Sequence, residues 1–378
     1  MHLLLWAKDS EPQLRAELTQ TFPGARTKSR QSLLLEPDFD IAAGQRLPDL
    51  VFARQLIPNA RAVHPESIRA WASEVFASIV GVVPETEPWA LQIEPHYGGR
   101  VTHRIGARAW HSATRHGSVA GPHAPGPKHR AAEAEAGRQR CLLIREAVIE
   151  LLQRKRRHLL RALRRETTPF GASDSVVQVL LTAPGSGFIS VATAPMPFEQ
   201  RHLISAFPRG EVPVAADKSA PSRAFAKLVE AELRLGRSIK AGETCVDLGA
   251  SPGSWTHVAT GRGACVVAVD RSPLRDDLMG NRNVQFHQAD AFRYKPARSV
   301  DWLLCDVIAE PERTARLLLD WLRRGWCRHF VVTLKLRDAP GDDVLATLKR
   351  ELPSLTSERR LARLSANKKE ACAFGAAV

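Results

Sequence analysis

The stretch Asp247-Leu-Gly-Ala-Ser-Pro-Gly-Ser-Trp-Thr256 is the most informative part of the carboxy-terminal half of the chain. It follows a short apolar run and opens a predicted helix. Gly249 and Gly253 permit a positive φ and a close approach of the backbone to a ligand, while Pro252 stiffens the turn. The Gly-x-Gly-x-x-Gly pattern of dinucleotide sites does not occur here, because two other residues follow the first glycine. The stretch therefore predicts a strand-to-helix turn that binds S-adenosylmethionine.

Acidic residues follow the next two predicted strands. The apolar run 264–269 ends in Asp270, about 20 residues after the first aspartate, where a ribose-binding acid is expected. The run 284–288 leads into Asp290-Ala291-Phe292, where an acid and an aromatic ring can bind an adenine. A single aspartate after a strand is as often a helix cap, but three in series favour a cofactor crevice. The expected cofactor-binding residues are Asp247, Gly249, Ser251, Pro252, Gly253, Ser254, Trp255, Asp270, Asp290, Ala291 and Asp306.

Strands and helices alternate through residues 215–378. Apolar runs at 300–306, 329–336 and about 371–377 predict further strands, and residues 312–323 predict a helix between the first two. The proline-containing segment 208–221 lacks periodicity and predicts a linker, with the domain boundary near residue 215. The fold class expected is α/β, with a carboxy-terminal doubly wound, Rossmann-like sheet.

Ionisable residues stand at the ends of the later strands. Asp306 ends one strand, Lys335 lies within the next, and Glu370 begins the last. A lysine in so apolar a strand is costly unless it is paired, and its pKa is open to tuning. Lys335 could then take the proton of an attacking hydroxyl, with Asp306, Lys227 and Glu370 orienting it. The simpler alternatives are a water-exposed lysine on an edge strand and a helix-capping aspartate.

Two other methyl-transfer chemistries fit less well. Methylation of an amino nitrogen would be expected to show Asp/Asn-Pro-Pro-Tyr/Phe where this chain has Asp306-Val-Ile-Ala309. Cytosine C5 methylation requires a nucleophilic cysteine, and strand alternation turns Cys305 to the opposite face from its neighbour. Transfer to a hydroxyl oxygen is therefore favoured.

Composition limits the partners and the compartment. The 378 residues carry a formal charge of +14, which indicates an anionic partner, most commonly nucleic acid. The six cysteines include no Cys-x-x-Cys pair, so disulfides and a zinc or other metal site are not expected. The sequence has neither a signal-peptide pattern nor an uninterrupted apolar run of about 18 residues. A cytoplasmic protein without a membrane segment is expected.

The amino-terminal half predicts small α/β units. Residues 1–60 form the first, and residues 61–210 the second, with a helix at 66–80, a strand at 89–94 and a hairpin at 176–191. Residues 97–138 are rich in Gly, Pro, His, Arg and Ala and lack periodicity, which predicts a flexible basic insertion. Its scattered histidines are more typical of a solvated loop than of a metal site.

A basic helix is predicted over residues 140–165, with nine basic residues against two acidic ones. One face is apolar, comprising Leu142, Leu143, Val148, Leu151, Leu152, Leu159 and Leu163. A solvated charged face is the usual interpretation, yet so much unbalanced positive charge favours phosphate contact. The expected RNA-binding residues are Arg154, Lys155, Arg156, Arg157, Arg161, Arg164 and Arg165.

Several motifs together resemble a known family. They are Ala220-Pro-Ser-Arg223, Lys227-Leu-Val-Glu-Ala231, the stretch 247–256, Cys305-Asp306, Gly325-Trp-Cys-Arg328 and Leu334-Lys335-Leu336. Over about residues 170–378 the chain resembles the bacterial ribosomal RNA large subunit 2'-O-ribose methyltransferase M (RlmM) family and, more distantly, the FtsJ-type methyltransferases. In the amino-terminal half, Phe52-Ala-Arg-Gln55 and the order of elements look like that family's accessory region with its THUMP RNA-binding domain.

The resemblance implies a catalytic tetrad of Lys227, Asp306, Lys335 and Glu370. It also implies S-adenosylmethionine as cofactor and a cytidine ribose of 23S ribosomal RNA, or of its precursor, as target, with a monomeric enzyme expected. The chain departs from the family pattern at Ser251, Ser254, Thr333 and Arg337. Two alternatives stay open: a 2'-O-methyltransferase acting on another RNA or nucleotide, and a non-catalytic RNA-binding ribosome-assembly factor that keeps the cofactor pocket.

Overall fold

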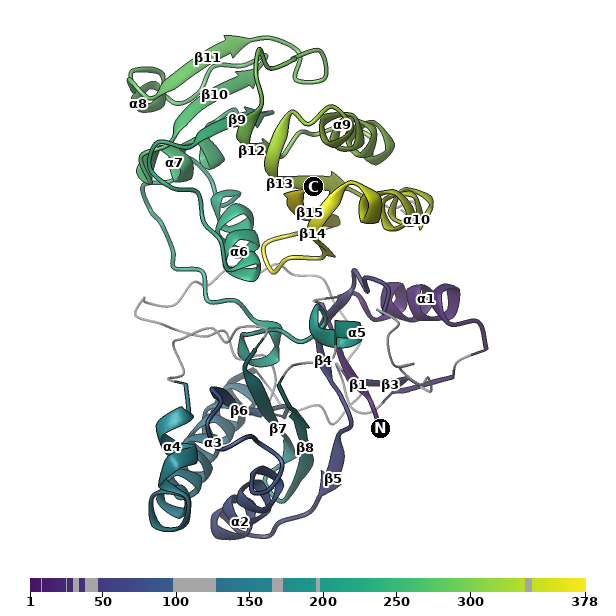
Figure 1. The fold of residues 1–378 in the computed structure, drawn as a ribbon, viewed down its shortest axis with the longest axis vertical. Coiled ribbons are helices and arrows are strands. Elements are labelled where there is room, and N and C mark those ends of the chain that lie inside the picture. The colour runs from purple at the N-terminus through teal and green to yellow at the C-terminus, as the bar shows by residue number, and fades with distance from the viewer. Residues whose placement is uncertain are drawn as a thin grey trace. The chain divides into compact units, whose positions relative to one another are not determined.

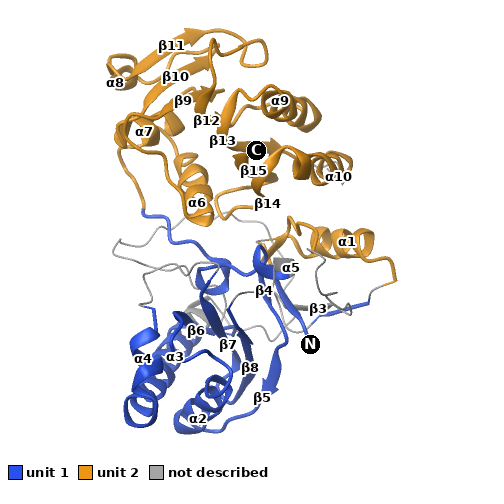
Figure 2. Ribbon diagram, viewed as in Figure 1, with its two compact units in different colours: residues 1–5, 26–46, 55–215 blue, residues 6–25, 47–54, 216–378 orange. Residues whose placement is uncertain are grey.

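The chain divides into two compact units. The computed structural model describes residues 1–7, 9–24, 26–29, 34–37, 47–97, 127–164, 173–194, 198–336 and 342–378 (Figure 1). Unit 1 comprises residues 1–5, 26–46 and 55–215, and unit 2 comprises residues 6–25, 47–54 and 216–378 (Figure 2). Two segments from the predicted domain 1–60 therefore pack with the carboxy-terminal unit. Most of the predicted insertion, together with Arg165 and Arg337, lies outside the described residues.

Unit 2 is built on a seven-stranded sheet. In spatial order its strands are β11 (Val284–Gln288), β10 (Cys265–Asp270), β9 (Thr244–Leu248), β12 (Val300–Cys305), β13 (Cys327–Lys335), β15 (Glu370–Ala377) and β14 (Thr356–Ala362). The first five strands are parallel, whereas β15 runs antiparallel to both β13 and β14. The chain leaves β9 toward β10 on one side and reaches β12 on the other, so the topological switch point lies at the carboxyl ends of β9 and β12. The predicted doubly wound α/β sheet is confirmed.

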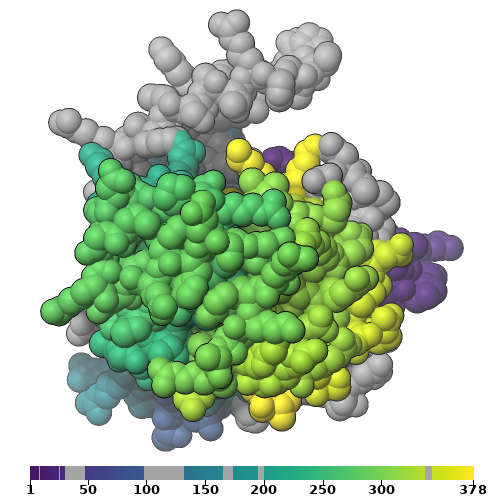
Figure 3. Space-filling model, turned by 90° about the horizontal axis from the view of Figure 1, so that it is seen from above, coloured from purple at the N-terminus to yellow at the C-terminus, as the bar shows by residue number. Residues whose placement is uncertain are grey.

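Helices cover both faces of this sheet. The helices of unit 2 among the described residues are α1 (Glu11–Thr21), α6 (Phe225–Leu235), α7 (Ser254–Gly261), α8 (Asp276–Met279), α9 (Pro311–Arg323) and α10 (Asp342–Glu351). Helices α6 and α7 lie on one side of the sheet, and α9 and α10 lie on the other (Figure 1). Figure 3 views unit 2 at right angles to this direction, with its green and yellow-green segments forming the face that is seen.

Alternation along the strands assigns side chains to the two faces. Trp302 and Leu304 of β12 belong to the core beneath α6 and α7, together with Val331 of β13 and Phe374 of β15. Because successive side chains of a strand point to opposite faces, Cys305 points away from that core. The same alternation directs residues 306, 335 and 370 toward α6.

Unit 1 contains a four-stranded sheet covered by two helices. Its strands, in the order β5-β8-β7-β6, are β5 (Arg61–Val63), β8 (Ser186–Ala192), β7 (Ser175–Ala183) and β6 (Trp89–Pro95). Helices α2 (Ile68–Ile79) and α3 (Pro127–Lys155) pack over a core that includes Trp71, Trp89 and Val148. The predictions of a helix at 66–80 and a hairpin at 176–191 are confirmed.

Shorter elements complete the chain. A second sheet has the order β2-β3-β1-β4 and consists of β2 (Thr27–Ser29), β3 (Leu34–Pro37), β1 (Leu3–Trp6) and β4 (Ala53–Ile57). The remaining helical elements are α4 (Arg157–Ala162), α5 (Phe198–Arg201) and two 3-10 turns at Pro208–Gly210 and Leu352–Ser354. Within the described part of the chain, no helix has the length and apolar character needed to cross a membrane.

The basic helix differs from its prediction in three ways. Helix α3 begins at Pro127, so the prediction of flexibility is wrong for residues 127–138, where alanines supply helix propensity without apolar periodicity. The helix ends at Lys155, and α4 follows a non-helical Arg156. Leu142 and Leu143, predicted to be buried, are 48 and 40 % exposed. Cys141 and Ile144 are buried in their place, beside the correctly predicted Val148 and Leu152, because these four residues recur at helical spacing.

Candidate active site

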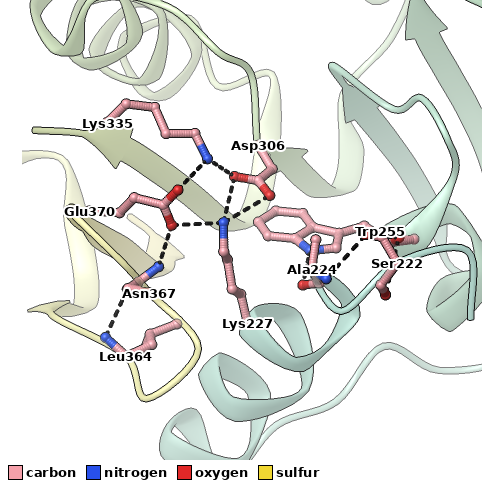
Figure 4. Close-up of polar contacts among 10 residues, drawn as sticks. Ser222, Ala224, Lys227, Trp255, Asp306, Lys335, Leu364, Asn367 and Glu370 are labelled. Carbon is pink, nitrogen blue, oxygen red and sulfur yellow. Dashed lines mark hydrogen bonds and ion pairs between the residues drawn. The ribbon is translucent and has the colours of Figure 1, made fainter. Parts of the chain in front are cut away.

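Four charged side chains, Lys227, Asp306, Lys335 and Glu370, form a closed ring in unit 2 (Figure 4). Lys227 Nζ lies 3.1 Å from both carboxylate oxygens of Asp306 and 2.7 Å from Glu370 Oε2. Lys335 Nζ lies 2.6 Å from Asp306 Oδ1 and 2.8 Å from Glu370 Oε1. Positive and negative groups alternate, so each charge has two neighbours of opposite sign. The structure thus brings together all four residues predicted to be catalytic.

Strand periodicity explains why the ring closes. Lys335 ends β13 and Glu370 begins β15, and the two residues are direct partners in the antiparallel register. Both share a strand face with core residues under α6, the helix that carries Lys227 in its first turn. Asp306 follows the last residue of β12 on that same face. One helix and three strand ends therefore deliver the four side chains to one point.

Mutual pairing compensates for burial in the ring. The four side chains are only 9 to 16 % exposed. Burial alone raises the pKa of Glu370, but its contacts with Lys227 and Lys335 outweigh burial and leave that pKa below the usual value. Burial lowers the pKa of Lys335, yet Asp306 and Glu370 hold it above that of an ordinary lysine. Lys335 therefore carries its proton in this arrangement, and a neutral amine requires an additional change of charge at the site.

The glycine-rich turn after β9 needs its glycines. Gly249 has a φ of 76°, and a Cβ there would lie 2.6 Å from Val307 Cγ1, in the loop that leaves β12. Gly253 has a φ of 109°, and a Cβ there would overlap Leu278 Cδ1. Side chains at either position would strain the backbone and collide with these neighbours. The glycines therefore let the turn pack closely against Val307 and Leu278 at the switch point of the sheet.

The first two predicted acids bind the backbone and neighbouring side chains of the turn. Asp247 is buried and its Oδ2 accepts a hydrogen bond of 2.7 Å from the Thr256 hydroxyl, so it fixes the first turn of α7. Burial raises the pKa of Asp247 to about 7. Asp270 accepts hydrogen bonds from the N–H groups of Ser251 and Ser272, at 3.0 and 2.9 Å. Asp270 therefore joins the end of β10 to the glycine-rich turn and keeps lone pairs for hydroxyl donors.

The third acid is surrounded by arginines that were not predicted. Asp290 accepts hydrogen bonds from the N–H of Phe292 at 2.9 Å and from Arg271 at 2.8 Å. These donors lower its pKa, with the Phe292 N–H as the largest cause. The guanidinium of Arg313 lies 3.7 Å from the centre of the Phe292 ring. An adenine could stack on the Phe292 side chain only if Arg313 moves away or stacks on the other face of the base.

Polar contacts hold α6 against the glycine-rich turn. Trp255 Nε1 donates to the carbonyl of Ala224 at 2.8 Å (Figure 4). The hydroxyls of Ser222 and Ser254 lie 2.7 Å apart. Two residues predicted to bind cofactor, Ser254 and Trp255, thus join α7 to the start of the helix that carries Lys227. Their contacts couple the cofactor turn to the charged ring.

Comparison with known proteins relates unit 2 to a methyltransferase family, as the sequence motifs predicted. Residues 220–331 match the model of the FtsJ-like methyltransferase family. Unit 2 contains an FtsJ-like methyltransferase domain. The family resemblance expected from the sequence is confirmed for this part of the chain. The matched residues include the glycine-rich turn and, from the ring, Lys227 and Asp306. Lys335 lies just beyond their end, and Glu370 follows in β15.

Several curated relatives of the FtsJ-like domain share one name. Ribosomal RNA large subunit methyltransferase M of Thauera aminoaromatica is 40 % identical over 155 residues, which is 39 % of this chain and 43 % of the relative. The protein of that name from Azoarcus sp. (strain BH72) is 37 % identical over 163 residues, 42 % of each chain. The one from Xanthomonas campestris pv. campestris (strain B100) is 42 % identical over 123 residues, 31 % of this chain and 35 % of the relative. The matches thus span about two fifths of the relatives' length.

Outside the FtsJ-like domain, the predicted RNA-binding residues fall into two groups. Five of them are exposed on α3, α4 and their junction, and together we call them the basic surface: Arg154, Lys155, Arg156, Arg157 and Arg161. Arg164 instead pairs with the buried Asp174 at 3.1 Å and stabilises unit 1. No group of three potential metal ligands occurs among the residues the structure describes. The histidines of the predicted insertion lie outside that part or have undescribed side chains, and His96, which precedes the insertion, is buried.

One polar residue beside the ring could not be found from the sequence. Asn367 Nδ2 donates a hydrogen bond of 3.0 Å to Glu370 Oε2 (Figure 4). It lies in the connection between β14 and β15, and β14 was not predicted. An isolated asparagine before a strand normally indicates only a turn, so nothing local distinguished it.

Proposed function

We propose that this protein transfers a methyl group from S-adenosylmethionine to the 2'-hydroxyl of a ribose in large-subunit ribosomal RNA. The observation that carries the proposal is the ring of Lys227, Asp306, Lys335 and Glu370 beside the glycine-rich turn of an FtsJ-like domain. The names of the curated relatives support ribosomal RNA as the substrate. The resemblance described above supports a cytidine of 23S ribosomal RNA as the target.

The residues at the switch point fit the cofactor. Gly249 and Gly253 let the turn after β9 adopt a positive φ and pack closely against Val307 and Leu278, and Asp270 at the end of β10 can accept ribose hydroxyls. Asp290 and Phe292, after β11, can bind the adenine amino group and ring face. When bound, S-adenosylmethionine would supply an electrophilic methyl group on a positive sulfonium, whose sulfur would leave as a neutral thioether when an oxygen bonds to the methyl carbon.

The charge of the ring matches this chemistry. Two ammonium groups and two carboxylates give the ring no net charge, and loss of one proton leaves it at minus one. A positive charge entering the site disfavours the ammonium form, so it lowers the pKa of Lys335. Neutral Lys335 then takes the 2'-hydroxyl proton at Nζ while the new carbon–oxygen bond forms. Asp306 and Glu370 hold the amine in place, and Lys227 pairs with both carboxylates from the other side.

RNA capture is assigned to unit 1, in keeping with the proposed THUMP-like character of residues 61–210. The basic surface offers five exposed cations within two consecutive helices. Such cations bind phosphates and RNA shape rather than base sequence. Binding should therefore weaken steeply as salt rises.

A transfer assay tests the proposal. Tritiated S-adenosylmethionine is incubated with the protein and with ribosomal RNA from cells lacking the gene, as mature and as precursor RNA, and Lys335→Ala is run beside the wild type. We expect incorporation into large-subunit RNA by the wild type and its loss in the variant, with the affinity for S-adenosylhomocysteine unchanged. No incorporation by wild-type protein that binds the cofactor would favour the assembly-factor alternative. Incorporation into another RNA would replace the proposed substrate.

A further inference from the structure

The connection between β14 and β15, residues 363–369, is tied to the elements that carry the two lysines of the ring. Ser365 N–H donates to Glu230 Oε2 at 2.8 Å, and Glu230 lies one turn after Lys227 on α6. Lys369 accepts, at its carbonyl, a hydrogen bond of 2.9 Å from the N–H of Leu336, the residue after Lys335. The connection is therefore held in place independently of the ring itself.

Asn367 lies in this connection and is 9 % exposed. Its Oδ1 accepts a hydrogen bond of 2.8 Å from the N–H of Leu364, and its own N–H donates to the Leu364 carbonyl at 3.1 Å. These contacts assign the amide oxygen to the turn and leave the amide nitrogen facing Glu370. Nδ2 donates to Glu370 Oε2 at 3.0 Å, as Figure 4 shows. The side chain thus connects a fixed turn to one oxygen of the ring.

The other groups facing Glu370 are all charged. Lys227 approaches Oε2 from α6, and Lys335 approaches Oε1 from β13, with Asp306 of the β12 end behind both lysines. The exposed Lys368 and Lys369 precede Glu370 in the chain. Asn367 is the neutral donor in this group, and it shares Oε2 with Lys227. It therefore fixes the rotation of the carboxylate without adding charge.

We propose that Asn367 is a positioning residue of the reaction: it holds Glu370 so that one oxygen serves each lysine, and thereby sets the proton affinity of Lys335. The inference rests on the proposed function, because it assigns a base to that reaction. Without the amide donor, Glu370 is free to rotate away from Lys335. With a negative group in place of the amide, the ammonium form of Lys335 is held more strongly.

Two substitutions separate these effects. Asn367→Asp keeps an oxygen for the Leu364 N–H but turns an oxygen toward Glu370, whereas Asn367→Ala removes the side-chain contacts. Asn281 is the matched control, since its Oδ1 also accepts a backbone hydrogen bond, of 2.9 Å from Asn283, in a turn before β11. Asn281→Asp and Asn281→Ala therefore make the same chemical changes away from the ring.

The readout is the pH dependence of kcat, with the affinity for S-adenosylhomocysteine and the thermal midpoint measured for every variant. The rising limb of the profile, which reports deprotonation of Lys335, should move to higher pH in Asn367→Asp and to lower pH in Asn367→Ala, by about half a unit or more. The plateau should fall about tenfold in both, because a displaced reactive group costs rate. The Asn281 variants should follow the wild-type profile.

Profiles of both Asn367 variants that superimpose on the wild type after scaling would overturn the inference and leave Asn367 a purely structural residue. A lowered thermal midpoint alone would do the same. Failure of the proposed function is distinguishable, since the wild-type protein would then transfer no methyl group to RNA.

Discussion

Lys335 and Glu370 lie directly opposite each other in the antiparallel pair of β13 and β15, and their charged atoms meet at 2.8 Å. All other neighbours of β13 and β12 in the sheet are parallel, so this pairing depends on the reversed strand β15. In a parallel pair the beginning of one strand would lie at the opposite edge from the end of its neighbour. Reversal of β15 thus lets a strand start supply a carboxylate at the catalytic edge of the sheet.

Breaking the ring should cost both activity and stability. Lys335→Met removes the proposed base and leaves Asp306 and Glu370 with a single cation, so we expect activity to fall about 10³-fold. The free energy of unfolding should fall by about 3 kcal/mol, as for other buried ion pairs that lose one partner. Transfer rates and urea unfolding measure the two effects.

The double variant Lys335→Met, Glu370→Gln is the matched control for this prediction. It leaves one cation and one carboxylate, and it should recover stability relative to Lys335→Met while remaining inactive. Equal stability of the single and double variants would show that the ring is not electrostatically coupled.

The two glycines of the turn after β9 should not tolerate a side chain. Gly249→Ala places a methyl group 2.6 Å from Val307 Cγ1 at a positive φ, and we expect a loss of about 2 kcal/mol with weaker binding of S-adenosylhomocysteine. Gly261→Ala in α7 is the control, because nothing lies within 4 Å of its added Cβ. Calorimetry measures the affinity of each variant for S-adenosylhomocysteine, and thermal unfolding measures its stability. Wild-type cofactor affinity in Gly249→Ala would place the cofactor elsewhere.

Asp247 should make the stability of unit 2 depend on pH. Its pKa is about 7 in the folded protein and about 3.9 in an unfolded chain, so between these values the folded state binds the extra proton. Stability from this group is therefore present at low pH and is lost as pH rises toward 7. Asp247→Asn should remove the dependence, and it should gain stability relative to wild type between pH 5 and pH 8. A constant difference between the two proteins across that range would contradict the assignment.

Removal of exposed cations should weaken RNA binding through phosphates. In a triple Arg154→Ala, Arg157→Ala, Arg161→Ala variant, the slope of log affinity against log salt should decrease by about 0.7 to 0.9 for each lost phosphate contact. A triple variant of the exposed Arg69, Arg282 and Arg298 makes the same change of net charge elsewhere. If both variants lose the same affinity, net charge rather than the basic surface is responsible.

The pattern of apolar and charged residues predicted the carboxy-terminal sheet and the clustering of the four charged side chains. Apolar runs defined β9 to β13, and alternation correctly turned Cys305 away from the face that carries Asp306. The order of the strands places the ends of β12 and β13 side by side, which is why charges at two strand ends that are distant in the sequence come together.

Contacts between distant segments could not be predicted in this way. Glu17 of α1 is buried in unit 2, where it accepts hydrogen bonds from the N–H groups of Val51 and Phe52 and from Lys349 of α10. These partners come from two parts of the chain that are distant from α1, and none carries a local signal. Asn367 and the stacking of Arg313 on Phe292 were missed for the same reason. Tertiary proximity, rather than residue type, gives these groups their roles.

The position of the methyl group on the product nucleoside distinguishes ribose methylation from base methylation. RNA methylated by the wild-type protein is digested to nucleosides and analysed by mass spectrometry, with Lys335→Ala in parallel. We predict a nucleoside that carries its methyl group on the ribose 2'-oxygen and that disappears in the variant. A methyl group on a base, or ribose methylation that persists without Lys335, would contradict the proposed mechanism.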